Sequence, residues 1–112
     1  MNQETILQKH YEFLKELIAT VNRFPKHQRF LIGDKMQAIG MTILELLVEA
    51  YYAPTVEKRL RLQKVNTELE KLRFYCRLCY ELGYYNSIKY NQLISLIQEI
   101  GKMTGGWLRS LK

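Results

Sequence analysis

The stretch Leu62-Gln-Lys-Val-Asn-Thr-Glu-Leu-Glu-Lys-Leu-Arg-Phe-Tyr-Cys-Arg-Leu-Cys79 repeats an apolar residue at alternating spacings of three and four. This spacing keeps the apolar side chains on one side of an α-helix. The positions concerned are Leu62, Val65, Leu69, Leu72, Cys76 and Cys79. The stretch therefore predicts a helix with a near-heptad apolar seam that packs against other helices.

Three further segments of helix length carry the same kind of seam. Pro25, Pro54 and the stretch 83–87 (Gly-Tyr-Tyr-Asn-Ser) separate the segments. The expected seam positions are Leu7, Tyr11, Leu14, Ile18 and Val21 in the first segment, Ile32, Met36, Ile39, Ile43, Leu46 and Ala50 in the second, and Tyr90, Leu93, Ile97, Ile100, Thr104, Trp107 and Leu111 in the last. Because the sequence shows no alternating strand pattern, residues 1–112 predict a single all-α domain, an antiparallel up-down four-helix bundle with short connections.

Residues at the expected helix ends carry their own signals. Thr55 directly after Pro54, and the pair Asn86-Ser87, are candidate N-caps because short polar side chains accept hydrogen bonds from the first turn of a helix. Gly83 fits a helix C-terminus, where the chain often needs a left-handed residue.

Two features predict contact with a further chain. The second segment presents Leu44, Leu47, Val48 and Tyr51 beside its seam, which is more apolar surface than a bundle helix needs. The alternative is a compact bundle that buries this helix more deeply than the others. Gly101 and Gly105 stand one turn apart on the last segment and predict close packing by a neighbouring helix or chain, or else a kink or fraying before Trp107.

Metal binding and catalysis have no support in the sequence. Cys76-x-x-Cys79 offers only half of a zinc site, and both cysteines continue the seam, so we expect them to pack in the core. Glu45 and Glu49 lack the histidine spacing of a di-iron bundle, and His10 fits a core histidine. We expect no cofactor, no metal and no enzymatic activity.

The charge balance favours acidic partners. The formal net charge is +6 and the isoelectric point is near 9.4. Lysines and arginines gather at the start of the third segment and near the C-terminus, at Lys58, Arg59, Arg61, Lys64, Lys102 and Arg109. They form either a patch usable by nucleic acid or a simply solvated surface, in which the C-terminal cations also favour the helix dipole.

Arg73 and Arg77 differ from these residues because they flank the apolar seam. Their position predicts partial burial, and a partly buried arginine needs a carboxylate or a phosphate in bidentate contact. An intrachain pair with Glu70, Glu81 or a glutamate of the second segment would satisfy the same need. The residues alone leave both possibilities open.

No run of eighteen apolar residues occurs, and the first residues lack the pattern of a secretory signal. These observations predict no membrane span and a cytoplasmic location.

Three stretches together resemble a known family. They are Leu72-Arg-Phe-Tyr-Cys-Arg-Leu78, Glu99-Ile-Gly-Lys-Met-Thr-Gly-Gly-Trp-Leu108 and Phe24-Pro-Lys. The sequence is similar over its full length to the accessory variability determinant proteins of diversity-generating retroelements. A broader four-helix-bundle family, which includes proteins encoded in intervening sequences of large ribosomal RNA genes, shares the same plan.

The resemblance implies a non-enzymatic bundle that assembles into a homopentamer with a basic surface. It also implies binding to the reverse transcriptase of the element and to its template RNA, in support of mutagenic cDNA synthesis. The family carries functional arginines on its third long helix. By the pattern Leu-Arg-x-x-x-Arg-Leu these arginines correspond to Arg73 and Arg77, which are therefore expected to contact the enzyme or the RNA. The alternative is a general interaction bundle that binds ribosomal RNA or another protein and has no retroelement role.

Overall fold

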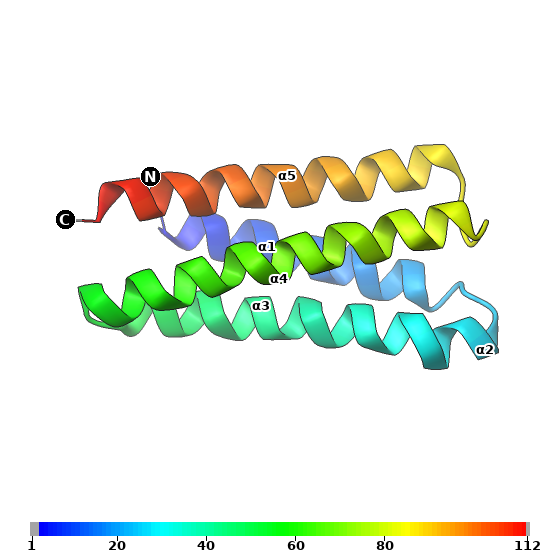
Figure 1. Cartoon of the computed structure of the whole chain (residues 1–112), viewed down its shortest axis with the longest axis horizontal. Coiled ribbons are helices and arrows are strands. Elements are labelled where there is room, and N and C mark those ends of the chain that lie inside the picture. The colour runs from blue at the N-terminus through cyan, green and yellow to red at the C-terminus, as the bar shows by residue number, and fades with distance from the viewer. Residues whose placement is uncertain (1–2, 112) are drawn as a thin grey trace.

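The computed structural model describes residues 3–111, in which four long helices run antiparallel to their neighbours along the chain (Figure 1). The elements are α1 (Gln3–Val21), α2 (Lys26–Gln28), the π-helical segment η1 (Arg29–Gly33), α3 (Asp34–Tyr52), α4 (Thr55–Glu81) and α5 (Ser87–Ser110). No strand occurs in this part of the chain. The all-α bundle is therefore confirmed, with α2 and η1 as a lead-in to α3.

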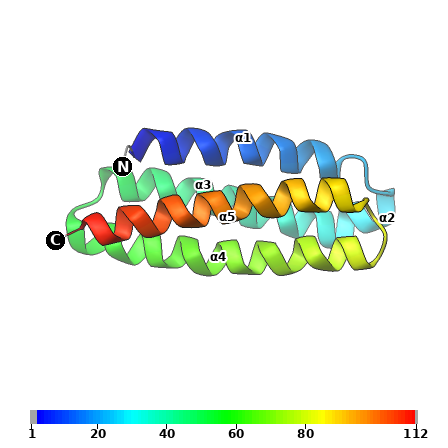
Figure 2. The same ribbon diagram turned by 90° about the horizontal axis from the view of Figure 1, so that it is seen from above.

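The four long helices close a bundle whose Cα atoms span 45 × 23 × 19 Å. α4 packs against α3 on one side and α5 on the other, and α1 also contacts both α3 and α5 (Figure 2). None of the helices in residues 3–111 is long and apolar enough to cross a membrane.

The seam of α4 is buried along its whole length. All six of its predicted positions, from Leu62 to Cys79, lie in the core. The seams of α3 and α5 are also confirmed, with partial burial at their outer members Ile32, Tyr90 and Leu111. Because each fully buried aliphatic side chain contributes about 1.5–3 kcal/mol, these seams supply much of the driving force for folding.

The predicted seam of α1 is confirmed at Leu14 and Val21 and in part at Leu7 and Ile18, but it is wrong at Tyr11. Tyr11 is 49% exposed, whereas Ile6, Phe13 and Leu17 are fully buried. The buried stripe contains the polar residue His10, which interrupts the apolar pattern and conceals the stripe in the sequence. It nevertheless brings Phe13 and Leu17 into the core, and this apolar bulk outweighs the polarity of one histidine.

His10 joins α1 to α3. Its Nε2 lies 2.8 Å from the carbonyl oxygen of Gly40, to which it donates a hydrogen bond, and its Nδ1 is buried without a partner. The two helices approach closely at this point, since a Cβ on Gly40 would lie 2.8 Å from the Cδ1 of Leu14. Burial lowers the pKa of His10, against a smaller opposing effect of the bond to Gly40. The expectation of a core histidine is confirmed, although only one of its two ring nitrogens has a hydrogen-bond partner.

The link between α4 and α5 is fixed by backbone hydrogen bonds. Gly83 has φ +80°, its N–H donates to the carbonyl of Tyr80 at 3.0 Å, and the N–H of Tyr84 donates to the carbonyl of Cys79 at 2.9 Å. These two bonds form a Schellman motif. The side chain of Asn86 then accepts from the N–H of Lys89 at 2.9 Å and caps α5. Both end signals read from this part of the sequence are confirmed.

Thr55 is not an N-cap. The helix already begins at Thr55, and the preceding Pro54 occupies the cap position with φ −62° and ψ 163°. The carbonyl of Pro54 accepts the first helical bond from the N–H of Lys58 at 2.8 Å. Proline can do this without a side-chain hydrogen bond because its ring already holds φ near the required value.

Part of the surplus apolar surface of α3 is buried within the bundle. Leu47 is fully buried, and Leu44 and Tyr51 are partly buried, whereas Val48 is 42% exposed. A groove of about 360 Å³ between α1 and α3 is lined by Leu7, Gln8, Tyr11, Leu44 and Val48. Deeper burial thus accounts for Leu47, and coverage of the remaining groove by another chain stays a prediction.

The glycines of α5 are not closely packed within this chain. A Cβ at Gly101 would meet nothing within 4 Å, and one at Gly105 would meet only the Nη1 of Arg109 at 3.3 Å. Helix α5 also continues past Trp107 to Ser110, so the alternative of fraying before Trp107 is wrong. Close packing by a helix of the same chain is likewise wrong, and packing by a neighbouring chain is left as a prediction.

Alanine substitutions at Gly83 and Gly101 are expected to shift stability in opposite directions. Gly83→Ala places a Cβ on a left-handed residue and costs about 1 kcal/mol. Gly101→Ala fills open space on a helix and stabilises by roughly 0.5–1 kcal/mol. Urea unfolding followed by circular dichroism measures both effects. A loss of stability with Gly101→Ala would instead show that another chain packs on this glycine.

Stability is expected to fall as the pH drops below 6.5, the usual pKa of histidine. Burial depresses the pKa of His10 in the folded state, so the unfolded chain binds the proton first and unfolding gains a proton in this window. His10→Leu should flatten the dependence between pH 6.5 and about pH 5, above the range where most carboxylates titrate. His27→Gln, which changes an exposed histidine, is the matched control. An unchanged slope in His10→Leu would contradict this assignment.

Candidate functional site

Arg73 and Arg77 form ion pairs within α4. The Nε and Nη2 of Arg73 donate to the two carboxylate oxygens of Glu70 at 2.8 and 3.0 Å. The Nε of Arg77 donates to Glu81 at 2.9 Å. The side chains of the arginines are 45% and 60% exposed, so the predicted partial burial is wrong. The rim of the seam faces solvent here, and partners three and four residues away on the same helix satisfy both guanidinium groups.

These pairs hold the arginines without withdrawing them from solvent. The hydrogen bond from Arg73 lowers the pKa of Glu70, and the hydrogen bonds to Glu70 and Glu81 raise the pKa of Arg73 and Arg77. Glu70, Arg73 and Arg77 therefore stay charged at neutral pH. Because exposed ion pairs are weak, an incoming carboxylate or phosphate can replace the glutamates at little cost.

Two stacked tyrosines lie beside the arginines. The rings of Tyr80 from α4 and Tyr90 from α5 are parallel to within 4°, with centroids 4.6 Å apart. Tyr80 lies three residues after Arg77 and therefore shares its side of α4, and the stack brings Tyr90 next to Tyr80. The Cζ of Arg73 also lies 5.3 Å from the centre of the Phe74 ring. Cationic and aromatic groups thus alternate on this face of α4 and α5, which we call the arginine–tyrosine face (Arg73, Phe74, Arg77, Tyr80, Tyr90).

The sequence prediction missed the tyrosines of this face. The seam pattern places Tyr90 in the core, and it is in fact partly buried. The sequence could have indicated Tyr80, because it lies three residues after Arg77 and is therefore its neighbour on the helix surface. Its stacking on Tyr90, however, depends on the register between α4 and α5.

A groove of about 290 Å³ opens next to Arg73, between α4 and α5. Its walls include Asn66, Glu70, Gln98 and Gly101. The groove stays open at Gly101 because this residue has no side chain and no neighbour fills the space. The amide groups of Asn66 and Gln98 add hydrogen-bonding capacity beside the guanidinium group of Arg73.

Lys58 and Arg59 lie at the opposite end of α4. The Nζ of Lys58 lies 5.5 Å from the centre of the Trp107 ring and donates to the carbonyl of Tyr51 at 3.3 Å. Arg59 donates to the carbonyl of Leu111 at 3.4 Å. With a rise of about 1.5 Å per residue, Arg59 is about 21 Å along the helix from Arg73. These two residues tie the start of α4 to the ends of α3 and α5.

Arg61 does not share a surface with Arg73 and Arg77. Arg61 turns toward α3 and pairs with Glu49 at 3.2 Å. A rotation of about 100° per residue places it about 160° around α4 from Arg77. Lys64, Lys102 and Arg109 are exposed. The structure therefore places Lys58, Arg59 and Arg61 away from Arg73 and Arg77, and a shared patch with the other three stays a prediction.

The cysteines pack in the core, as predicted. Both are fully buried, and the Sγ of Cys79 lies 3.5 Å from the Sδ of Met36. Burial raises the pKa of each thiol to about 12, so neither is a thiolate at neutral pH.

The comparison with protein families identifies the relatives of this bundle. The profile of the bAvd-like family matches residues 5–111, a range that takes in almost all of α1 and the whole of the other helices. The chain belongs to the bAvd-like family. No curated protein matches the chain significantly.

A solved structure has the same fold as this bAvd-like protein. It is a protein of unknown function from the S23 ribosomal protein family of Bacteroides thetaiotaomicron, with a TM-score of 0.91 and 17% sequence identity. The match covers 98% of this chain and 100% of that one. At this identity the likeness establishes the shared four-helix fold alone.

Proposed function

We propose that this bAvd-like protein is a non-enzymatic accessory factor of a diversity-generating retroelement. In this role it binds the reverse transcriptase and the template RNA and supports mutagenic cDNA synthesis. The observation that carries the proposal is the family match over residues 5–111, because it spans the whole bundle and not a single motif.

The arginine–tyrosine face supplies chemistry suited to this role. Two charged guanidinium groups can each exchange a glutamate for a phosphate or carboxylate in bidentate geometry. The stacked rings of Tyr80 and Tyr90 beside them offer an aromatic surface on which an unpaired base can stack. Arg73 and Arg77 are accordingly the residues proposed to contact the enzyme or its RNA.

The other basic residues have supporting roles in the proposal. Lys64, Lys102 and Arg109 add to the positive field that attracts an anionic strand. Lys58, Arg59 and Arg61 have partners within the chain and so contribute charge with less freedom to rearrange. The net charge of +6 per chain becomes a strong field when several copies assemble.

Self-association as a homopentamer completes the proposal. Rotational symmetry repeats one modest binding face several times, which raises avidity without new contacts. The open groove between α1 and α3 is a surface of this chain that could receive another copy. The cytoplasm is the proposed location.

One observation favours a second candidate function. The structural relative belongs to the S23 ribosomal protein family, and a general bundle that binds ribosomal RNA or another protein would have the same fold. Genomic neighbours distinguish the two functions. An adjacent reverse transcriptase gene with paired variable and template repeats supports the retroelement role, and their absence supports the alternative.

Arg73→Ala combined with Arg77→Ala is expected to weaken binding to the reverse transcriptase and its RNA while the fold persists. Both side chains are exposed and pair only with Glu70 and Glu81 in the described chain, so circular dichroism and the native mass of the assembly should not change. If RNA is the partner, the slope of log affinity against log salt should fall by about one unit for each phosphate that the variant no longer binds.

The matched control for this variant is Lys15→Ala combined with Lys35→Ala. It removes the same charge from exposed positions on α1 and α3, and Lys15 forms a comparable pair with Glu12. Equal reductions in affinity in the two double variants would show that net charge alone matters. Full binding by the arginine variant would remove Arg73 and Arg77 from the site.

Glu70→Gln combined with Glu81→Gln is expected to strengthen binding of single-stranded RNA. The change removes the anions that compete for both guanidinium groups. Fluorescence anisotropy with a labelled strand measures the affinity. Glu12→Gln combined with Glu45→Gln gives the same change in net charge away from the face, so a gain equal to that of the control would refute the competition.

A further inference from the structure

A second hollow lies on the other side of α5, where its first turns meet the end of α1. It has a volume of about 430 Å³ and is bordered by Arg23, Tyr84, Tyr85, Asn86, Lys89 and Gln92, among others. None of these residues belongs to the arginine–tyrosine face or to the eight basic candidates. The hollow therefore needs its own explanation.

One wall of this hollow is aromatic and firmly held. Tyr84 and Tyr85 both pack against Phe24, with ring centroids 5.4 and 6.0 Å apart. The hydroxyl of Tyr85 donates a hydrogen bond to the carbonyl of Cys76 at 2.5 Å. Burial raises the pKa of Tyr85, so its phenol stays neutral and keeps this bond. Two tyrosines fixed in this way can receive a flat ring without rearranging.

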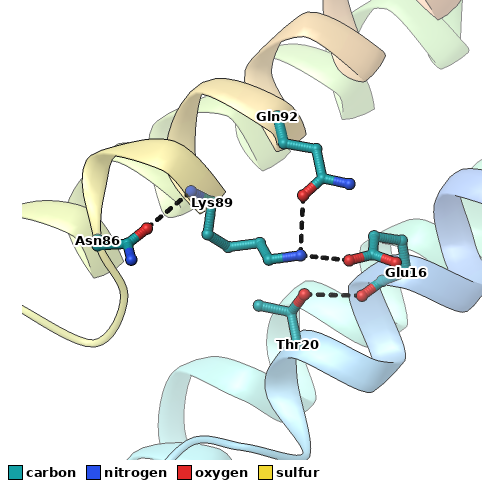
Figure 3. A network of polar contacts seen from close by, with 5 residues as sticks. All are labelled: Glu16, Thr20, Asn86, Lys89 and Gln92. Carbon is teal, nitrogen blue, oxygen red and sulfur yellow. Dashed lines mark hydrogen bonds and ion pairs between the residues drawn. The ribbon is translucent and has the colours of Figure 1, made fainter.

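A polar network holds the other side of the hollow (Figure 3). Lys89 reaches across from α5 to the carboxylate of Glu16 on α1, and its Nζ also donates to the Oε1 of Gln92 at 2.9 Å. Because Lys89 occupies the amide oxygen of Gln92, the orientation of that amide is set. The Nε2 of Gln92 forms no hydrogen bond within residues 3–111, and Gln92 lies at the edge of the hollow.

The charges around the hollow favour an anion. Glu16 neutralises Lys89, but no carboxylate in the described part of the chain lies within 4 Å of the guanidinium group of Arg23. The first turn of α5 contains no acidic residue, so the positive end of the helix dipole is not neutralised there. Arg23, the Nε2 of Gln92 and the start of α5 together present donors and positive charge beside the tyrosine wall.

We propose that this hollow binds a nucleoside 5′-phosphate. The base lies against Tyr84 and Tyr85, and Arg23 and the amide of Gln92 hold the phosphate. The volume falls within the range of about 300–1,000 Å³ that small-molecule sites occupy. A free nucleotide and the 5′-phosphorylated end of an RNA strand share this chemistry. The site uses none of the residues assigned to the accessory role and does not depend on it.

The first test is a titration with adenosine 5′-monophosphate followed by NMR. The expected result is a shift of the backbone amides of residues 86–89, with affinity at least about tenfold higher than for adenosine or for inorganic phosphate alone. Equal binding of inorganic phosphate would overturn the role of the aromatic wall. The absence of shifts at these amides would overturn the site.

Gln92→Glu gives the sharpest variant. The new carboxylate has the shape of the amide and can still accept from Lys89, but it repels a phosphate. Nucleotide affinity should fall at least about tenfold. Asn91→Asp, which adds the same charge at the preceding, exposed residue of α5, should change it little. Equal effects of the two variants would overturn the proposal.

Arg23→Gln provides a second variant in case Gln92→Glu disturbs the bundle. It removes an exposed positive charge without touching the helix core, and Lys35→Gln on α3 is its control. Unchanged nucleotide binding in Arg23→Gln would overturn the assignment of the phosphate position.

The two sources of the ligand are separated by competition. An RNA oligonucleotide with a 5′-phosphate displaces the nucleotide if the site receives RNA ends, and the same strand with a 5′-hydroxyl does not. If neither strand competes, the site binds free nucleotide, and either result supports the hollow. The Arg73→Ala, Arg77→Ala variant should retain nucleotide binding, so failure of the accessory role leaves this test intact. Loss of binding in that variant would place the nucleotide on the other face and overturn the proposal.

Discussion

The burial of the α4 seam between α3 and α5 is the constraint on which the rest of the bundle depends. Six apolar side chains from Leu62 to Cys79 lie in the core, and this fixes the rotation of α4 about its own axis. Any other rotation would expose part of the seam at a cost of about 1.5–3 kcal/mol for each large side chain. Once the seam is buried, Arg73 and Arg77 must lie at the solvent rim, and Arg61 must lie toward α3. The packing of the core thus decides which charges share a surface.

The arginines are held by weak contacts to near neighbours on the same helix. Glu70 and Glu81 keep the guanidinium groups ordered while leaving them charged and exposed to solvent. A buried interhelical pair would have contributed more to specificity of the fold but would have been costly to break. Lys89 illustrates the contrast, because its pair with Glu16 joins α5 to α1 and is largely shielded. The start of α5 therefore carries an ion pair that links two helices. The ion pairs of α4 lie within one helix, and their arginines can exchange the glutamates for another anion.

Sequence periodicity predicted the fold and the complete seam of α4, because a regular repeat on one helix needs no knowledge of its neighbours. The stripe of α1 could not be chosen in this way, since His10 enters the core only through a hydrogen bond to Gly40, thirty residues away. The sequence predicted that Arg73 and Arg77 flank the seam of α4, but it did not predict that both side chains are exposed. The Tyr80 and Tyr90 stack and the hollow beside α5 were beyond prediction, because each depends on how two helices are aligned.

The turn at Gly83 concentrates tyrosines at one end of the molecule. Tyr80, Tyr84, Tyr85 and Tyr90, half of the eight tyrosines in the chain, gather around this one turn. The opposite pole, where α4 begins and α5 ends, carries Lys58, Arg59 and Arg109. In a cyclic assembly every copy points the same way along the symmetry axis, so this polarity is multiplied and not cancelled. A ring of these bundles with their long axes along that axis would gather these four tyrosines of every copy at one rim.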